Sequence, residues 1–347
     1  MLNPQVTSKL WTPQLGRYLD GGPLPVGEFL MIIGCQGYRK WGADAQKLVS
    51  VCPVSFASEI ESPQQLIQEL AKADYLAEPG LATALFCAVR LPQPLLLEGE
   101  AGVGKTQAAK ALAQLLDTPL IRLQCFEGID ASEALYEWNY PRQLLSIRMA
   151  ESQGKSIEES SLFSREFLIE RPLLQALEHV GPNPAVLLID EVDRADEEFE
   201  AFLFEMLAES TVSVPELGTL TAQQKPIVIL TSNRTRDLHD ALKRRCLYHW
   251  IDYPSLEHAT QIVKLRAPKA SKDLAEQVAA AVSRIRTLDM QKPPGVAEAI
   301  DWVNAAMLLG VSTLDARGTE QTLGSVLKYR DDQELAREQG LAWIAGE

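Results

Sequence analysis

Short apolar runs alternate with longer amphipathic segments through the middle of the chain. The runs are four or five residues long, and in the segments between them apolar residues recur at helical spacing. We predict strands at residues 94–98, 120–123, 185–189 and 227–231. Strands that alternate with helices in this way predict an α/β fold, in which a parallel sheet is flanked by helices.

The pattern changes after about residue 255, where no further strand is predicted. One helical stripe runs from Leu274 to Ile285 and another from Val296 to Met307, with Pro293-Pro294-Gly295 between them. A small α-helical domain therefore follows the α/β domain.

We predict four regions along the 347-residue chain. They are an N-terminal extension of unknown role (1–57), the α/β domain (58–254), the helical domain (255–310) and a C-terminal tail (311–347). The extension contains no motif that points to a function, and the tail is mixed in charge and weakly helical.

The first predicted strand leads into a glycine-rich loop with the pattern Gly99-x-x-x-x-Gly104-Lys105-Thr106, and a helix begins at once. This is the strand–loop–helix context of a phosphate-binding P-loop, although an ordinary glycine-rich turn is the alternative. Glycines let the backbone turn tightly and aim N–H groups at phosphate oxygens, and the helix N-terminus adds partial positive charge. Lys105 can reach the β- and γ-phosphates, and the Thr106 hydroxyl can hold Mg²⁺. The predicted nucleotide-binding residues are Gly99, Glu100, Ala101, Gly102, Val103, Gly104, Lys105, Thr106 and Gln107.

Two adjacent carboxylates, Asp190 and Glu191, end the third apolar run. In a P-loop protein, Asp190 would bind the Mg²⁺ through its water shell, and Glu191 would lie beside the γ-phosphate and polarise the attacking water. The alternative is a solvated acidic turn, because more acidic residues follow as far as Glu198.

The fourth apolar run leads to Asn233, whose amide can orient a water or touch the γ-phosphate. Arg244 and Arg245 follow a short helical segment. A planar guanidinium suits an arginine finger that reaches the phosphate of a neighbouring subunit. The alternative is a solvated basic turn.

The overall charge and cysteine content limit the classes of function. A formal net charge of −14 disfavours nucleic acid or an anionic membrane as the main partner, although it leaves room for a local basic patch. We expect no membrane span, and no secretory signal is evident at the N-terminus, so we expect a cytoplasmic protein. The five cysteines form no Cys-x-x-Cys pair, which favours free thiols over disulfides or a zinc site.

These motifs occur in the order typical of AAA+ ATPases, and the chain resembles that family over about residues 58–310. It is similar to the MoxR group in particular, because Arg194 follows the acidic pair, residues 211–218 resemble a hairpin, and residues 129–165 can hold an insert in helix 2. Residues 136–140, 170–174 and 244–250 resemble the CoxD-like subgroup, the accessory ATPases of carbon monoxide dehydrogenase maturation.

The resemblance implies a P-loop AAA+ domain followed by a helical lid, with ATP and Mg²⁺ as cofactors. It implies a ring oligomer, commonly a hexamer, in which ATP lies at subunit interfaces. It also implies two partners: a separate protein with a von Willebrand A domain, and a client that in the CoxD-like subgroup is a molybdenum hydroxylase awaiting its metal centre. Within the family the finger usually closes the basic pair, which favours Arg245 over Arg244.

One position departs from the family pattern. Glu298 stands where the lid helix usually carries the sensor 2 arginine. Either another arginine substitutes, with Arg194 as the candidate, or turnover is slow. The main hypothesis is therefore an ATP-hydrolysing chaperone, and the alternative is a nucleotide-gated assembly scaffold that hydrolyses little. A small-molecule kinase and a nucleic-acid translocase fit the motifs and the charge less well.

Overall fold

The computed structural model describes residues 60–347, apart from residue 92 and the segments 155–157, 210 and 215–216. The chain divides into two units, 1–54 and 55–347, and every described residue belongs to the second. The predicted extension at 1–57 lies outside the described residues.

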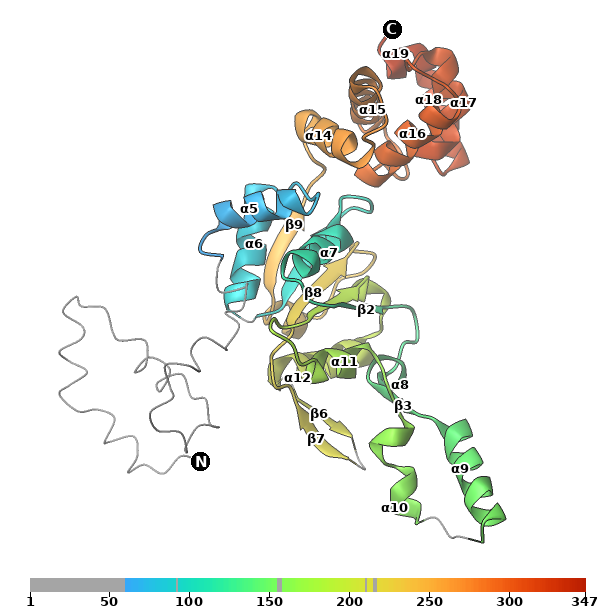
Figure 1. Ribbon diagram of the computed structural model, residues 1–347. Helices are drawn as coiled ribbons and strands as arrows, with labels where there is room; N and C mark the ends of the chain where they lie inside the picture. The colour runs from blue at the N-terminus through green and yellow to red at the C-terminus, as the bar shows by residue number, and fades with distance from the viewer. Residues whose placement is uncertain (1–59, 92, 155–157, 210, 215–216) are drawn as a thin grey trace, which may run out of the picture. The chain divides into compact units, whose positions relative to one another are not determined.

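A sheet of five parallel strands forms the centre of the α/β part (Figure 1). The strands are β1 (Leu95–Gly99), β2 (Leu120–Gln124), β5 (Val186–Asp190), β8 (Ile227–Ser232) and β9 (Leu247–Ile251), in the spatial order β2-β5-β8-β1-β9. The four predicted strands are confirmed. The sequence did not predict the fifth, β9, because its mixture of aromatic and polar residues is not an apolar run. It forms by pairing with β1 at the edge of the sheet.

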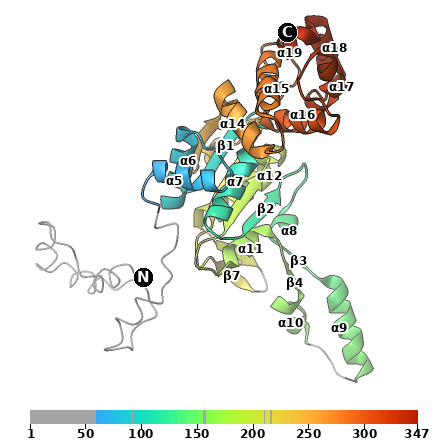
Figure 2. The same cartoon turned by 45° about the horizontal axis from the view of Figure 1, so that its top comes forward.

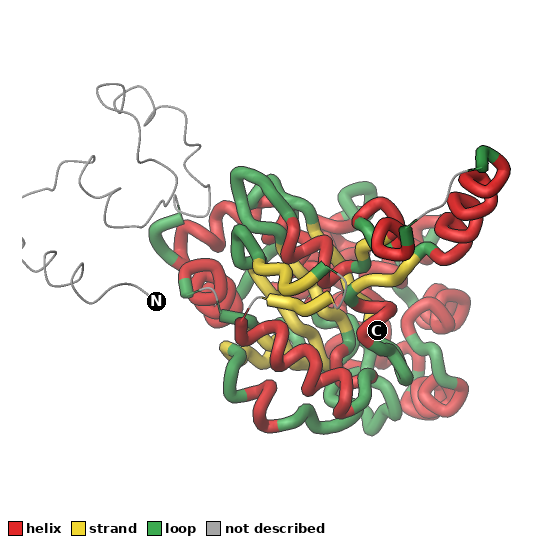
Figure 3. Tube along the Cα trace, turned by 90° about the horizontal axis from the view of Figure 1, so that it is seen from below, coloured by secondary structure: helices red, strands yellow, loops and turns green. Residues whose placement is uncertain are grey.

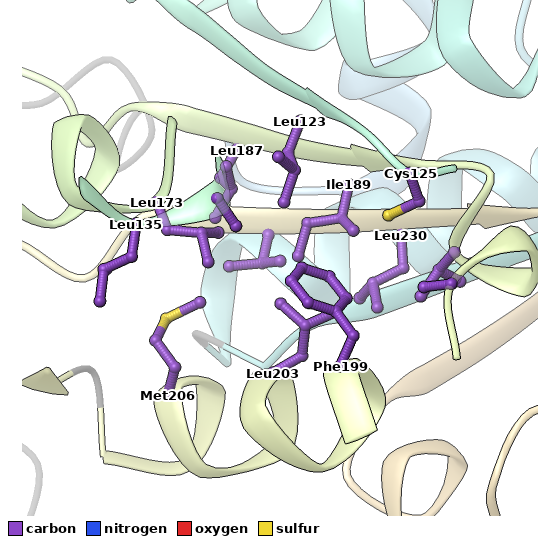
Figure 4. Packing of buried hydrophobic residues seen from close by; sticks show 14 of the residues in the cluster. Leu123, Cys125, Leu135, Leu173, Leu187, Ile189, Phe199, Leu203, Met206 and Leu230 are labelled. Atoms are coloured by element: carbon purple, nitrogen blue, oxygen red, sulfur yellow. The ribbon is translucent and has the colours of Figure 1, made fainter. Parts of the chain in front are cut away.

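Helices cover both faces of this sheet, as Figure 3 shows with the strands enclosed between them. On one face, Leu95 and Leu97 pack against α5 (Pro63–Lys72), α6 (Pro79–Arg90) and α7 (Lys105–Leu115). On the other face, the alternate residues pack against α11 (Pro172–Glu178) and α12 (Glu197–Glu209). In Figure 4, Phe199 and Leu203 of α12 point at Ile189 and Leu230 of the strands. Burial of each leucine contributes about 2 kcal/mol to the stability of the fold. The two packed layers therefore hold the strands, and the residues at their ends, in place.

A substructure is inserted between β2 and β5. It consists of α8 (Ala131–Ala134), β3 (Tyr136–Trp138), α9 (Tyr140–Ser152), α10 (Glu159–Leu162), a 3₁₀ turn (Arg165–Phe167) and β4 (Leu168–Glu170). The sequence predicted that the insert ends at about residue 165. Because β3 pairs with β4, it ends at Glu170 instead. Figure 2 shows α9 and α10 beyond this pair of strands.

A second hairpin precedes β8. Its strands β6 (Thr211–Val214) and β7 (Gly218–Thr221) pair antiparallel, with Thr211 opposite Thr221. The hairpin predicted at residues 211–218 is therefore present, and it extends three residues further.

Six helices follow the sheet: α14 (Leu256–Arg266), α15 (Lys272–Ile285), α16 (Val296–Leu308), α17 (Ala316–Val326), α18 (Arg330–Gln339) and α19 (Leu341–Ala345). They share one hydrophobic core, in which Trp302 is fully buried and donates from Nε1 to Thr322 Oγ1 at 2.6 Å. Residues 311–347, expected as a weakly helical tail, thus form helices that pack into the same core as α14–α16. The strongly polar sequence of α18 gives little hydrophobic pattern from which to predict this packing.

Two further properties were expected from composition. Across the described ranges, no helix is both long and apolar enough to cross a membrane. Cys87, Cys125 and Cys246 are free, and burial raises the pKa of the Cys125 and Cys246 thiols to about 12, so neither is a reactive thiolate at neutral pH.

Candidate functional site

A cavity of about 690 Å³ opens at the carboxyl ends of the strands. Its walls are residues 73–76, the loop 101–107, the ends of β5 and β8, and one side of α14 and α16. The volume lies in the range of pockets that hold small-molecule ligands, and the position is where parallel α/β sheets bind them.

The glycine-rich loop forms the floor of the cavity. Gly102 and Gly104 have φ angles of +79° and +101°, a region that favours glycine over residues with a Cβ atom. A Cβ atom on Gly102 would also lie only 2.6 Å from Glu298 Oε2. Gly104 is the N-cap of α7 without a side-chain cap, so the first N–H groups of this helix are open to an anion. This cradle fits a phosphate group.

Lys105 lies in the loop with only 7% of its surface exposed. Its Nζ donates hydrogen bonds to Gly99 O at 2.6 Å and Glu100 O at 2.8 Å. Burial lowers the pKa of Lys105, whereas the nearby carboxylates, with Asp193 first, oppose that shift. A phosphate would offer this ammonium a stronger acceptor than the two carbonyls.

Asp190 lies at the end of β5 with 2% of its surface exposed. Its Oδ1 accepts hydrogen bonds from Thr231 Oγ1 at 2.5 Å and Thr106 Oγ1 at 3.1 Å. Arg122 of β2 pairs with its Oδ2, at 2.6 Å from Nη2 and 3.0 Å from Nε. Hard oxygen ligands on a carboxylate and a hydroxyl are the donors that Mg²⁺ prefers, so the predicted pair Thr106–Asp190 fits this ion. Sequence reasoning missed Thr231 and Arg122.

Glu191 lines the cavity and has φ +56°, a left-handed conformation that is uncommon outside glycine. Its Oε2 accepts hydrogen bonds from Gln124 Nε2 at 3.1 Å and Arg194 Nη1 at 3.2 Å. Strained backbone of this kind is concentrated at functional sites. Arg194, predicted as a catalytic residue, touches Glu191 but does not line the cavity. Gln124 was not predicted.

Asn233 also lines the cavity, just beyond β8. The buried Asp193 Oδ2 accepts hydrogen bonds from Asn233 N at 3.2 Å and Thr235 N at 2.8 Å. The carboxylate thereby ties the segment that carries Asn233 to the turn after β5. From the sequence alone, Asp193 was expected only as part of an acidic, solvated run.

Arg244 and Arg245 lie apart from the cavity, at the end of α13 (Asp240–Lys243). Both are exposed. The Arg245 guanidinium lies 4.0 Å from the centre of the Phe204 ring on α12, a cation–π contact. Arg244 has no side-chain hydrogen bond or ion pair with any described residue. Neither arginine reaches the nucleotide cavity of its own chain.

The carboxylate of Glu298 does not enter the cavity, as its position in the sequence had suggested it would. Its Oε2 accepts a hydrogen bond from Gly295 N at 2.8 Å and so caps α16. The helix N-terminus donates to Gly102 O from Val296 N at 3.1 Å and Ala297 N at 3.3 Å. Glu298 does not line the cavity, and its acid group is committed to the junction between lid and P-loop.

Residues 94–246 match the family model of the AAA domain, dynein-related subfamily. This segment is therefore an AAA+ ATPase domain, and it includes the loop, the two carboxylates, Asn233 and both arginines. This match supports a general ATPase function. Proteins of the family bind nucleotide, typically with Mg²⁺, and generally assemble into rings.

Three of the solved structures that this chain matches are proteins of Thermotoga maritima. The RuvB A156S mutant is 16% identical, with a TM-score of 0.42, and the match covers 76% of this chain and 71% of that one. The RuvB Holliday junction branch migration motor is 16% identical, with a TM-score of 0.40 and coverage of 78% and 72%. Domain III of the replication initiation protein DnaA is 14% identical, with a TM-score of 0.39 and coverage of 76% and 94%.

Proposed function

We propose that the protein is an ATP-hydrolysing chaperone of the MoxR type that remodels a protein client. One observation carries the hydrolytic part of this proposal. Lys105, Thr106, Asp190 and Glu191 line one cavity, although 84 residues separate the Thr106 and Asp190 side chains that are in contact. The residues that the chemistry needs are therefore gathered at one place.

We assign the binding roles as follows. The loop 99–107 holds the phosphates through its N–H groups, and Lys105 exchanges its two carbonyl acceptors for phosphate oxygens. Thr106 and Asp190 would hold Mg²⁺, which would supply positive charge to neutralise the phosphates.

In the chemical step, Glu191 accepts a proton from the attacking water. The water oxygen bonds to the γ-phosphorus while the bond from that phosphorus to the ADP oxygen breaks, which gives ADP and phosphate. Asn233 orients the water or the γ-phosphate. Gln124 and Arg194 hold the Glu191 carboxylate, which gives Arg194 a positioning role in this scheme.

Arg244 or Arg245 would act in the site of a neighbouring subunit. Both are exposed and neither lines the cavity of its own chain, which supports a role between subunits in a ring, commonly a hexamer. The family resemblance favours Arg245. Its stacking on Phe204 fixes the guanidinium of Arg245, whereas no described residue makes such a contact with Arg244.

The finer assignment rests on resemblance and on two structural elements that agree with it. The insert between β2 and β5 and the β6–β7 hairpin occupy the places expected in the MoxR group. By analogy alone, the partner is a protein with a von Willebrand A domain, and the client is a molybdenum hydroxylase that needs its metal centre.

The scaffold alternative depended on Glu298 as an acid close to the γ-phosphate. Because its carboxylate caps α16, this residue no longer argues against hydrolysis. The test is ATP turnover by the wild-type protein beside the Glu191→Gln variant. A wild type that binds ATP but does not turn it over, even when assembled, would favour the scaffold. Affinity capture with Glu191→Gln, which should hold ATP-bound complexes, tests the client: recovery of a molybdenum hydroxylase supports the assignment, and its absence under ATP contradicts it.

A further inference from the structure

We infer that Arg122 is a built-in competitor of Mg²⁺ for the Asp190 carboxylate, and that it sets the Mg²⁺ concentration at which nucleotide binds. This inference rests on the proposed ATP site. It starts from the ion pair between β2 and β5, in which Nη2 and Nε of Arg122 both approach Asp190 Oδ2.

The strands place Arg122 on the same face of the sheet as Asp190. Leu123 and Ile189 belong to the apolar layer on the opposite face, so their sequence neighbours Arg122 and Asp190 project toward the P-loop side. Gln124 lies directly opposite Asp190 in the register. The pairing is thus a consequence of strand register and does not depend on a mobile loop.

The protein itself uses both oxygens of Asp190. Oδ1 accepts from Thr231 and Thr106, and Oδ2 is taken by Arg122. A metal ion held through this carboxylate needs a lone pair that points at the metal or at one of its waters. Mg²⁺ must therefore share Oδ2 with the guanidinium or displace it, and two cations on one carboxylate repel each other.

The Arg122 side chain can dissociate from Asp190 and bind it again. Its side chain is 48% exposed, so the guanidinium can move into water without being buried unpaired. Nη2 also donates to Gln124 Oε1, which offers a second acceptor outside Asp190. Asp190, at 3% side-chain exposure, cannot hydrate in the same way and depends on a cation.

The pair also explains how the empty site tolerates its negative charge. Asp190, Glu191 and Asp193 lie within four positions at the end of β5. Without metal, Arg122 neutralises the negative charge of the buried Asp190 carboxylate. When metal and nucleotide enter together, that neutralisation passes to the metal, and the chain has little affinity for Mg²⁺ alone.

The test measures Mg²⁺ dependence of nucleotide binding, which is independent of hydrolysis. ADP affinity is measured by calorimetry over a series of Mg²⁺ concentrations for wild type, Arg122→Gln and Arg330→Gln. The Arg330 variant removes the same charge from an exposed ion pair with Glu334 on the helical domain. We expect the half-saturating Mg²⁺ concentration to fall about three- to tenfold in Arg122→Gln, because the competing guanidinium is half exposed and its charge is partly screened. It should stay unchanged in Arg330→Gln.

An unchanged or higher Mg²⁺ requirement in Arg122→Gln overturns the inference. If the wild type binds no ADP at any Mg²⁺ concentration, the proposed function fails instead, so the two failures are distinguishable. Should Arg122→Gln not fold, Arg122→Lys keeps the charge but has a single ammonium, and a smaller fall in the same direction is expected.

A measurement on the wild type needs no variant. Modification of Arg122 by phenylglyoxal, read by peptide mass, should become faster when Mg²⁺ and ADP are added together, because the guanidinium leaves Asp190. A rate that stays the same or falls in the loaded protein contradicts displacement.

Discussion

The phosphate end of the cavity and the arginine pair after α13 differ in whether their charged side chains have partners of opposite charge. At the phosphate end, charged groups such as Lys105 and Asp190 have partners in the same chain. At the arginine pair, two guanidiniums face solvent, and within the described residues neither has a carboxylate partner. In the first region, the charged groups that nucleotide binding requires all lie in one chain. In the second region, the two guanidiniums remain available to bind an anion, which a group that acts on another copy of the chain needs.

Removal of both arginines should have the largest effect if this contrast is correct. We expect Arg244→Ala/Arg245→Ala to lower ATP hydrolysis by about a thousandfold or more, the size of effect seen for a finger that stabilises transition-state charge. ATP affinity should stay within about twofold, since neither residue lines the cavity. Steady-state turnover and calorimetry give the two numbers. Lys243→Ala on the same short helix is the control, and an equal loss there would mean that general positive charge matters and not a finger.

Glu191→Gln should separate binding from chemistry at the phosphate end. Glutamine keeps the size of the side chain but cannot accept a proton from water, so hydrolysis should slow at least about a hundredfold while ATP binds normally. Single-turnover kinetics and calorimetry measure these two effects. Glu198→Gln, on exposed α12 surface nearby, should behave like the wild type. Turnover close to wild type in Glu191→Gln would place the base elsewhere.

Lys105→Ala tests binding itself. Loss of the only lysine in the glycine-rich loop should weaken ATP at least about tenfold, which is about 1.4 kcal/mol or more. Lys72→Ala, which removes an exposed lysine paired with Glu69 on α5, serves as the matched variant. Equal affinity in Lys105→Ala and wild type, measured by calorimetry, would mean that the loop does not hold phosphate.

Phe204→Leu should have the smallest effect and would sharpen the choice between the two arginines. Among the described residues, the ring makes a cation–π contact with Arg245 and not with Arg244, and an exposed contact of this kind contributes about 0.5–1 kcal/mol. If Arg245 is the finger, hydrolysis should fall about two- to fivefold as its guanidinium loses orientation, with ATP affinity unchanged. A full loss in Arg244→Ala combined with normal turnover in Phe204→Leu would assign the finger to Arg244.

The sequence predicted the parts of the site that depend on neighbouring residues. The P-loop and the acidic pair each follow a continuous apolar run, and such runs are the fully buried strands β1 and β5. It could not predict contacts between distant segments. Arg122 lies 68 positions from Asp190, and Asp193 lies 40 positions from the Asn233 amide that it holds, so neither partner is visible without the strand order.

The remaining differences in the fold have similar causes. Edge strand β9 depends on pairing with β1 and not on an apolar pattern of its own. Glu298 occupies the expected position on the lid helix, but the close approach of Gly102 and Gly295 directs its carboxylate to the helix N-terminus. The sequence shows which residue stands at that position, whereas backbone packing decides where its side chain points.

The central claim is that the arginines of one copy complete the nucleotide site of another, and a mixing experiment tests it most directly. Arg244→Ala/Arg245→Ala protein has an intact P-loop, and Lys105→Ala protein has intact arginines. Each alone should be nearly inactive, and their mixture should recover part of the wild-type ATP hydrolysis as mixed assemblies form. Absence of recovery, with mixed assemblies verified by mass, would contradict the claim and leave the arginine pair as a structural turn.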